Sequence, residues 1–165
     1  MLITLTGFMG SGKTSIGRIV ADALDCPFLD LDELVEKQAH KSVAQIFASE
    51  GEAAFRAQEA AVLKKTVNKY AESTVVLALG GGTLGNPESA RLVSEKCLCI
   101  YLKASVDTLR EHLADGAETR PLLQGDWPAL LESRLPVYES TAAVILDTDG
   151  LTPEEIADEI IIDCL

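Results

Sequence analysis

One stretch near the N-terminus has the residue types and spacing of a phosphate-binding loop. Residues 7–14 read Gly-Phe-Met-Gly-Ser-Gly-Lys-Thr and fit G-x-x-x-x-G-K-[ST], between an apolar run and a helix-like segment. Glycines let successive N–H groups turn toward phosphate oxygens, and the following helix adds partial positive charge. The pattern assigns the Lys13 ammonium to the β- and γ-phosphates and the Thr14 hydroxyl to Mg²⁺. A glycine-rich tight turn would not explain Lys13 and Thr14 at this offset.

Two carboxylates follow a second apolar run. Asp30 and Asp32 flank Leu31 at the end of a predicted strand, where residues two apart share a face. Ligands bind at the C-terminal edge of parallel sheets, so we expect both carboxylates beside the phosphate loop. One could help to hold hydrated Mg²⁺, and the other could accept an acceptor's hydroxyl proton or hydrogen-bond to it. Asp32 could instead cap the next helix.

A triple glycine and three arginines complete the candidate groups. Three glycines cost backbone entropy, so a ligand that approaches the backbone closely and a plain flexible turn explain them about equally well. A lone arginine is usually a solvated surface residue, but arginines beside such landmarks stand out in a chain with 14 basic and 26 acidic residues. The groups are Gly80, Gly81, Gly82, Arg56, Arg120 and Arg134.

Strands and helices that could position these residues alternate along the chain. Short apolar runs predict five strands, at residues 2–6, 27–31, 74–79, 97–102 and 143–146. Helical spacing and capping residues predict helices at residues 13–24, 34–41, 52–70, 105–113 and 127–138, and helices that begin at 42, 87 and 152. We interpret residues 115–126 as a mobile loop. The alternation predicts an α/β domain with a parallel sheet covered on both faces, but it does not give the strand order.

Composition limits the classes of protein that remain. The 165 residues fit one domain, and 47% hydrophobic with 24% charged residues is ordinary for a soluble globular protein. The formal net charge of −12 would repel nucleic acid, although a few arginines in one cleft can still bind a small anion. We therefore expect small-molecule substrates and no nucleic-acid partner.

The cysteines and the apolar runs bear on location. Cys97 and Cys99 lie in an apolar run, and no pair of cysteines has metal-ligand spacing, which favours buried thiols in a reducing compartment. No run approaches the ~18 apolar residues of a membrane span, and residues 1–9 lack the basic leader of a signal peptide. We expect a cytoplasmic protein that does not bind membranes and works as a monomer.

Taken in order, the motifs resemble those of the shikimate kinase family. They are the phosphate loop at 7–14, Asp-Leu-Asp at 30–32, Glu-Gly-Glu-Ala-Ala-Phe-Arg at 50–56, the triple glycine at 80–82, Arg-Pro-Leu-Leu at 120–123 and Arg-x-Pro-x-Tyr at 134–138. Each motif alone is modestly specific, whereas the ordered set is highly specific and spans essentially the whole chain. The resemblance implies a three-layer α/β/α fold like that of nucleoside monophosphate kinases, with strand order 2-3-1-4-5.

The resemblance implies a reaction and a nucleotide site. ATP and shikimate would give ADP and shikimate 3-phosphate, a step toward chorismate and the aromatic amino acids. Lys13 matches the family's catalytic lysine, and Asp30 matches an acid that reaches Mg²⁺ through water beside Thr14. The residues expected to contact ATP are Gly10, Ser11, Gly12, Lys13, Thr14, Ser15, Arg120 and Pro153.

The resemblance also implies an acceptor site. Asp32 matches the acid that contacts the ring hydroxyls and is the proposed base, whereas Arg56 and Arg134 match the pair that binds the shikimate carboxylate. Gly80, Gly81 and Gly82 match the backbone that lines this pocket. Arg120 matches a catalytic arginine on a lid. The expected organisation is a single domain over 1–165, with a shikimate-binding segment at about 31–60 and a lid at about 112–125.

Three positions depart from the family pattern or are ambiguous. His112 falls where family members often carry an arginine that stacks on adenine; imidazole can stack too, or the residue can simply lie on a helix surface. Pro153 falls at the family's adenine-binding loop but is also a typical first residue of a helix. Leu79 stands where members often have Thr or Ser, and we expect little consequence.

Two other functions fit less of the sequence. A kinase for another small hydroxy acid, such as gluconate, would share the phosphate loop but not the joint placement of Asp32, Arg56 and Arg134. A GTP-dependent switch needs Asn-Lys-x-Asp, and residues 68–71, Asn-Lys-Tyr-Ala, fail at the fourth position. A non-catalytic binding module would be expected to have lost Lys13, Asp30 or Arg120, and all three are present.

Overall fold

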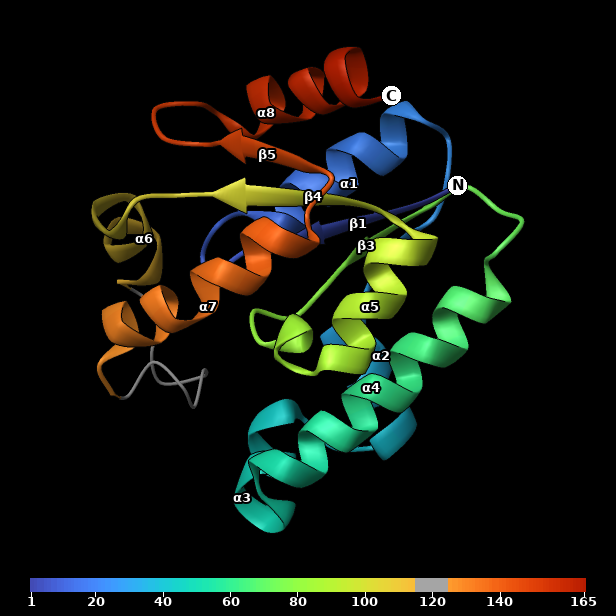
Figure 1. The fold of residues 1–165 in the computed structure, drawn as a ribbon, viewed down its shortest axis with the longest axis vertical. Coiled ribbons are helices and arrows are strands. Elements are labelled where there is room, and N and C mark those ends of the chain that lie inside the picture. Colours follow the sequence, from blue (N-terminus) through green and yellow to red (C-terminus); the bar gives the residue numbers. More distant parts are fainter. Residues whose placement is uncertain (115–124) are drawn as a thin grey trace.

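A parallel β-sheet forms the centre of the protein (Figure 1), whose computed structural model describes residues 1–114 and 125–165. Its strands are β1 (Leu2–Thr6), β2 (Phe28–Asp30), β3 (Val75–Ala78), β4 (Leu98–Lys103) and β5 (Val144–Asp147). They lie in the order β2-β3-β1-β4-β5, and each neighbouring pair is parallel. The predicted fold class and the strand order implied by the resemblance are both confirmed.

Alternation along the strands divides the apolar side chains between two cores. On β1, Ile3 and Leu5 join the core beneath α1 (Lys13–Ala23) and α8 (Pro153–Glu159), whereas Leu2 faces the other core. That second core lies under α4 (Glu52–Lys69), α5 (Pro87–Lys96) and α7 (Trp127–Thr141). Figure 1 shows these helices on opposite sides of the sheet, which gives the three layers. After α8 the chain continues as a π-helix over Ile160–Cys164.

Three further helices begin where the sequence predicts. Ser42 forms a capping box with Gln45 at the start of α3 (Val43–Glu50). Asn86 caps α5, and Ser105 caps α6 (Val106–Leu113). A short 3₁₀ turn, η1 (Thr83–Gly85), follows the triple glycine. Together with α4, the helices α2 (Leu31–Ala39) and α3 form the lower end of the molecule in Figure 1.

The boundary between β2 and α2 differs from the prediction. The strand ends at Asp30 and the helix begins at Leu31, so the predicted strand ended one residue too late and the predicted helix began three residues too late. The cause is local, because Asp30 Oδ1 accepts hydrogen bonds from the N–H groups of Asp32 (2.9 Å) and Glu33 (3.3 Å). Asp30 is therefore the cap, and the alternative that Asp32 caps this helix is wrong.

The second difference is in α7, which continues to Thr141, three residues beyond its predicted end, although Pro136 lies inside it. A proline inside a helix removes one backbone hydrogen bond. Here Tyr138 and Thr141 are both buried against the rest of the fold, which holds the last turn in place.

Of the predicted loop at 115–126, residues 115–124 lie outside the described part of the chain. The same holds for Arg120 and for most of the segment expected to form a lid.

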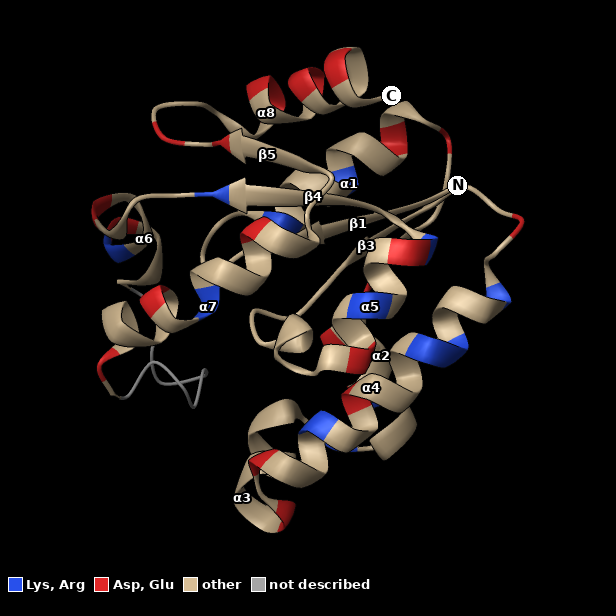
Figure 2. Ribbon diagram, in the orientation of Figure 1, with Lys and Arg blue, Asp and Glu red and all other residues tan. Residues whose placement is uncertain are grey.

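Charge is unevenly distributed over the helices. The charged residues of α8 are all acidic, whereas Lys and Arg are spread over α4, α5 and α7 (Figure 2). Within residues 1–114 and 125–165, no helix combines the length and the apolar character needed to cross a bilayer. Basic groups are scarce, so their position relative to the phosphate loop is informative.

Candidate active site

The phosphate loop joins β1 to α1. Gly10 and Gly12 have φ angles of +82° and +94°, a region that L side chains rarely adopt, and Gly12 is the residue that precedes α1. The Lys13 ammonium donates hydrogen bonds to the carbonyl oxygens of Gly7 (2.7 Å) and Phe8 (3.0 Å). The glycines thus give the loop its curvature, and Lys13 lies against it at the N-terminus of a helix, where anions bind favourably.

A cavity of about 580 Å³ opens beside this loop. Four of the segments singled out in the sequence meet there: the phosphate loop, the acid pair, the triple glycine and the turn before α8. The lining residues are Met9, Gly10, Gly12, Lys13, Thr14, Ser15, Asp30, Asp32, Ala78, Leu79, Gly80, Gly81, His112 and Pro153. Ser11 is not among them, because its side chain is buried and packs against Gly7.

The position of Pro153 fits both interpretations made from the sequence, a residue near the nucleotide and the first residue of a helix. It lines this cavity, and it is the first residue of α8, which Thr152 and Glu155 cap with a capping box. The contact with the cavity is therefore compatible with an ordinary helix start.

The two residues expected at the metal are neighbours. The Thr14 hydroxyl donates to Asp30 Oδ2 at 3.2 Å, while the other oxygen of Asp30 caps α2. In the described part of the chain, no three or more His, Cys, Asp and Glu side chains gather in a way that could hold a metal by themselves. One hydroxyl and one carboxylate nevertheless fit Mg²⁺, which prefers oxygen ligands and usually keeps several waters and substrate phosphates.

Asp32 lies in the first turn of α2 and has an unusual acidity. Burial, helped by the negative charges of Asp30 and Glu59 and opposed by Lys13 and Arg56, raises the pKa of its carboxyl group to about 6. A carboxyl group with such a pKa, beside a phosphate loop, is suited to exchange a proton near neutral pH.

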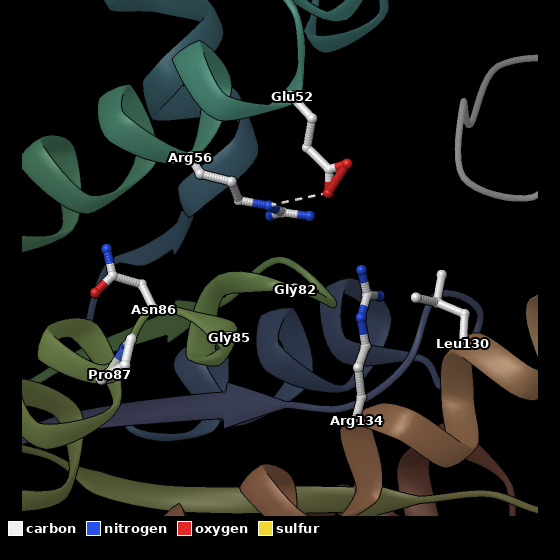
Figure 3. A pocket seen from close by; sticks show the side chains of 8 residues that line it. All are labelled: Glu52, Arg56, Gly82, Gly85, Asn86, Pro87, Leu130 and Arg134. Atoms are coloured by element: carbon white, nitrogen blue, oxygen red, sulfur yellow. Dashed lines mark ion pairs between the residues drawn. The ribbon is translucent and has the colours of Figure 1, made fainter.

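A second cavity, of about 550 Å³, lies next to the triple glycine (Figure 3). Arg56 reaches into it from α4 and Arg134 reaches into it from α7, on opposite sides of Gly82. The lining residues are Glu52, Arg56, Gly82, Gly85, Asn86, Pro87, Leu130 and Arg134. Two guanidinium groups that face one cavity can bind a small carboxylate with paired hydrogen bonds.

The triple glycine connects the two cavities. A Cβ atom built on Gly82 would lie 2.4 Å from Arg56 Nη2 and 2.8 Å from Arg134 Nη2, and one on Gly80 would lie 3.2 Å from Asp32 Oδ1. A Cβ atom on Gly81 would lie 3.2 Å from Arg134 Nη1 and 3.6 Å from the backbone nitrogen of Met9 in the phosphate loop. A side chain at residue 82 would therefore displace the guanidinium group of one or both arginines. The triple glycine brings the acid, the arginines and the loop together.

Sequence reasoning missed Glu59. The residue is 2% exposed, and its carboxylate binds Arg56 Nη1 at 3.0 Å and accepts a hydrogen bond from the Thr83 hydroxyl at 2.9 Å. Glu59 therefore fixes Arg56 on α4 and ties it to η1. The signal was present, because Glu59 follows Phe55 by one helical turn on the apolar face of α4, where a charged residue needs a partner.

Arg134 is held differently, by aromatic neighbours. Its guanidinium carbon lies 5.7 Å from the ring centroid of Phe8, a residue of the phosphate loop. The Tyr138 hydroxyl, one turn further along α7, donates to the carbonyl oxygen of Gly81. Burial raises the pKa of Tyr138 to about 12, with Arg134 opposing the shift, so this hydroxyl remains a donor. Tyr138 belongs to the Arg-x-Pro-x-Tyr motif, but no role was predicted for it.

Comparison with known proteins agrees with this geometry. The sequence model of the shikimate kinase family matches residues 9–165. A shikimate kinase of Dictyoglomus turgidum is 41% identical over 164 residues, which cover 96% of this chain and 94% of that protein. The structure of shikimate kinase from Acinetobacter baumannii in complex with shikimate superposes with a TM-score of 0.90 at 31% identity, covering 97% of this chain and 90% of the other.

A gluconokinase from Sinorhizobium meliloti shares the fold alone. Its structure superposes with a TM-score of 0.65 at 22% identity and covers 95% of this chain and 87% of that one. With the family match over nearly all residues, and with relatives about 40% identical along nearly their whole length, the chain belongs to the shikimate kinase family of ATP-dependent transferases.

Proposed function

We propose that this protein transfers the γ-phosphoryl group of ATP to the 3-hydroxyl of shikimate. The observation that carries the proposal is the position of the triple glycine. Gly82 lies against the guanidinium groups of both Arg56 and Arg134. Gly80, two residues earlier in the chain, lies against Asp32. An acceptor with a carboxylate at one end and a hydroxyl at the other would match this arrangement.

In this proposal the phosphate loop binds the triphosphate. Backbone N–H groups of the loop and of the first turn of α1 donate to phosphate oxygens, and the Lys13 ammonium neutralises the β- and γ-phosphates. The nucleoside lies toward His112 and Pro153, which line the same cavity. Thr14 would hold Mg²⁺ directly and Asp30 would hold it through water, and the ion would neutralise charge on the phosphates.

The acceptor binds across the triple glycine. Arg56 and Arg134 bind its carboxylate, because a planar guanidinium group matches a planar carboxylate better than an ammonium does. Asp32 then hydrogen-bonds to the hydroxyl that attacks. Its ionised form accepts the proton as the O–P bond forms, or orients the hydroxyl where the loose transition state needs little help from a base.

Three further parts of the proposal follow from the resemblance. Arg120, which lies outside the described residues, would bind the transferring phosphoryl group as part of a lid over about 112–125. A positive charge there stabilises the transition state, and a closed site excludes water as a competing acceptor. The protein would act in the cytoplasm as a monomer, as a single domain whose acceptor-binding segment is about 31–60.

A coupled assay for ADP tests the acceptor. ADP formation by the purified protein with ATP and Mg²⁺ should depend on shikimate, and gluconate and other small hydroxy acids should give far less turnover. Equal or greater turnover with another hydroxy acid would favour a different acceptor. No stimulation by shikimate at any reasonable pH and Mg²⁺ concentration would refute the proposal.

A substitution at Arg134 tests the pocket. Loss of a charge-assisted pair costs about 1.5–3 kcal/mol, so Arg134→Ala should raise the KM for shikimate by about tenfold to a hundredfold. The KM for ATP should change little. The matched control is Arg91→Ala. Arg91 lies on the exposed face of α5 and pairs only with Glu95 among the described residues. An equal loss of affinity for both substrates would contradict the assigned carboxylate site.

A further inference from the structure

A histidine of α6 contacts the backbone of the phosphate loop. His112 Nδ1 lies 2.7 Å from the carbonyl oxygen of Gly10. A carbonyl oxygen can only accept, so Nδ1 must carry the hydrogen and donate it. Of the two ring nitrogens, Nδ1 is therefore used by the loop.

The next residue strengthens this contact. A Cβ atom built on Gly10 would lie 2.9 Å from Leu113 Cδ2 and 3.5 Å from His112 Cβ. Leu113 is buried, whereas His112 is exposed on the outside of the same turn. The end of α6 thus packs against Gly10 and places the imidazole over the carbonyl group of that residue.

The contact fixes one peptide group of the loop. The Gly10–Ser11 peptide is planar and trans, so the direction of the Gly10 carbonyl sets the direction of the Ser11 N–H, which donates to the Phe8 carbonyl oxygen at 3.2 Å. Gly10 has φ of +82° and no side chain to restrict rotation. Without His112, the surrounding backbone alone would hold this peptide.

The other end of α6 is anchored as well. The backbone nitrogen of Ser105 donates to Asp149 Oδ1 at 3.0 Å. Thr148, beside Asp149, donates to the Lys103 carbonyl oxygen from its nitrogen (2.8 Å) and from its hydroxyl (2.9 Å). Because Asp149 belongs to the turn that leads to Pro153, α6 links the two walls of the nucleotide cavity.

We propose that His112 is a positioning residue for the triphosphate, because its Nδ1–H holds the Gly10–Ser11 peptide in the orientation that phosphate binding requires. The role differs from stacking on the nucleobase, which needs the ring face and not a hydrogen on Nδ1. It rests on triphosphate binding by the loop and not on the identity of the acceptor, so a failed shikimate assay would leave it standing.

Two substitutions separate the roles. In His112→Asn the amide nitrogen can take the place of Nδ1 as donor, whereas His112→Phe keeps a ring and loses the donor. Losing one exposed hydrogen bond should raise the KM for ATP about three- to tenfold in His112→Phe. The KM for ATP should stay near the parent value in His112→Asn, and kcat should change less in both. His40→Asn controls for loss of the only other histidine, which ends α2 at φ +57°.

Inorganic triphosphate, which has no base, gives a second measurement. His112→Phe should weaken its binding by the same factor as that of ATP. If His112→Asn were the impaired variant, or if only ATP binding changed, stacking on the base would replace the proposal. If neither variant differed from the parent, the contact would have no functional role.

Nitrogen-15 NMR of the imidazole reports the tautomer directly. The chain has two histidines, so His40→Asn leaves only the signals of His112. At alkaline pH, where the ring is neutral, the hydrogen should reside on Nδ1, although free imidazole side chains favour Nε2. A hydrogen on Nε2 would refute the proposal independently of the kinetics.

Discussion

The two ends of the active site are built in different ways. At the nucleotide end, one continuous stretch, residues 7–14, supplies the curved backbone, the ammonium of Lys13 and the hydroxyl of Thr14. At the acceptor end, the groups are side chains that three helices bring together, with Asp32 from α2, Arg56 from α4 and Arg134 from α7. The nucleotide end therefore depends on local conformation, and the acceptor end on tertiary packing.

The two arginines of the acceptor end also differ from each other. Arg56 is paired with buried Glu59 and, more loosely, with half-exposed Glu52 at 3.9 Å. Arg134 instead lies over Phe8 and beside Tyr138. Both are oriented before any substrate arrives, which reduces the entropy lost on binding. Among the described residues, Arg56 alone of the two has carboxylate partners that an anionic substrate would have to share or displace.

The largest effect is expected at Lys13, where the two ends would meet at the transferring phosphoryl group. Lys13→Met should lower kcat by about 10²- to 10³-fold, because it removes a charge that stabilises the transition state. The KM for shikimate should change much less. Lys64→Met, an exposed lysine of α4, serves as the control in the same coupled assay. Activity within a fewfold of the parent would mean that the loop does not contact the transferring group.

A smaller loss is expected at Asp32. Asp32→Asn should lower kcat/KM about a hundredfold, near the lower end of the range for general bases, because a loose transition state needs little base help. The parent enzyme should lose activity as the pH falls below about 6, since protonated Asp32 cannot accept the hydroxyl proton. A pH profile of kcat/KM should show this acid limb in the parent and not in the variant. An unchanged limb would assign it to another group.

Asp32→Asn, which should lower activity, should stabilise the folded protein at neutral pH. Burial raises the pKa of Asp32 above that of an unfolded chain, 3.8, to about 6. Asp32 therefore contributes to the stability of the folded state in full below about pH 4, and this contribution is lost as the pH rises through 6. At pH 7 Asp32→Asn should raise Tm, whereas at pH 4 the difference should shrink. A lower Tm at pH 7 would show that the carboxylate stabilises the fold.

Gly82→Ala should affect only the acceptor end of the site. The added methyl group would meet the guanidinium groups of Arg56 and Arg134 at 2.4 and 2.8 Å, so one or both must move. We expect the KM for shikimate to rise about tenfold, the lower end for disturbing a charge-assisted pair, with the KM for ATP unchanged. Gly85 lines the same cavity, but a methyl group there would meet nothing within 4 Å. Gly85→Ala is therefore the matched control. If both variants bound shikimate equally well, the arginines would not set its affinity.

The contrast between the two ends explains what sequence could predict. The phosphate loop, the caps at Ser42 and Ser105 and the helix start at Pro87 depend on residues a few positions apart, and the structure has them as predicted. The alternative that Asp32 caps α2 was wrong by two residues, because Asp30 and Asp32 are chemically equivalent candidates and only the end of β2 decides between them.

The acceptor end could not be assembled from residue types alone. Nothing in the spacing of Arg56 and Arg134 shows that both lie against Gly82, and they were placed together only through the resemblance. The contacts of Glu59 with Thr83 and of Tyr138 with Gly81 could not be predicted, because these partners are 24 and 57 residues away along the chain. Such contacts arise from packing, which periodicity does not encode.

The smallest effect is expected at Glu52, where a substitution tests how the two arginines differ. Glu52 lines the acceptor cavity, and its carboxylate forms an ion pair with Arg56 Nε at 3.9 Å (Figure 3). A substrate carboxylate would compete with it for Arg56. Glu52→Gln should therefore lower the KM for shikimate about two- to fivefold, the scale of a solvent-exposed ion pair.

Glu50→Gln supplies the control, because Glu50 forms its ion pair with Lys41 and does not line the cavity. The KM for ATP should be the same in both variants, and the difference between them should narrow at high salt, where exposed charges are screened. A higher KM for shikimate in Glu52→Gln would reverse the interpretation. Glu52 would then orient Arg56 for the substrate as Glu59 does, and the two arginines would differ only in what holds them.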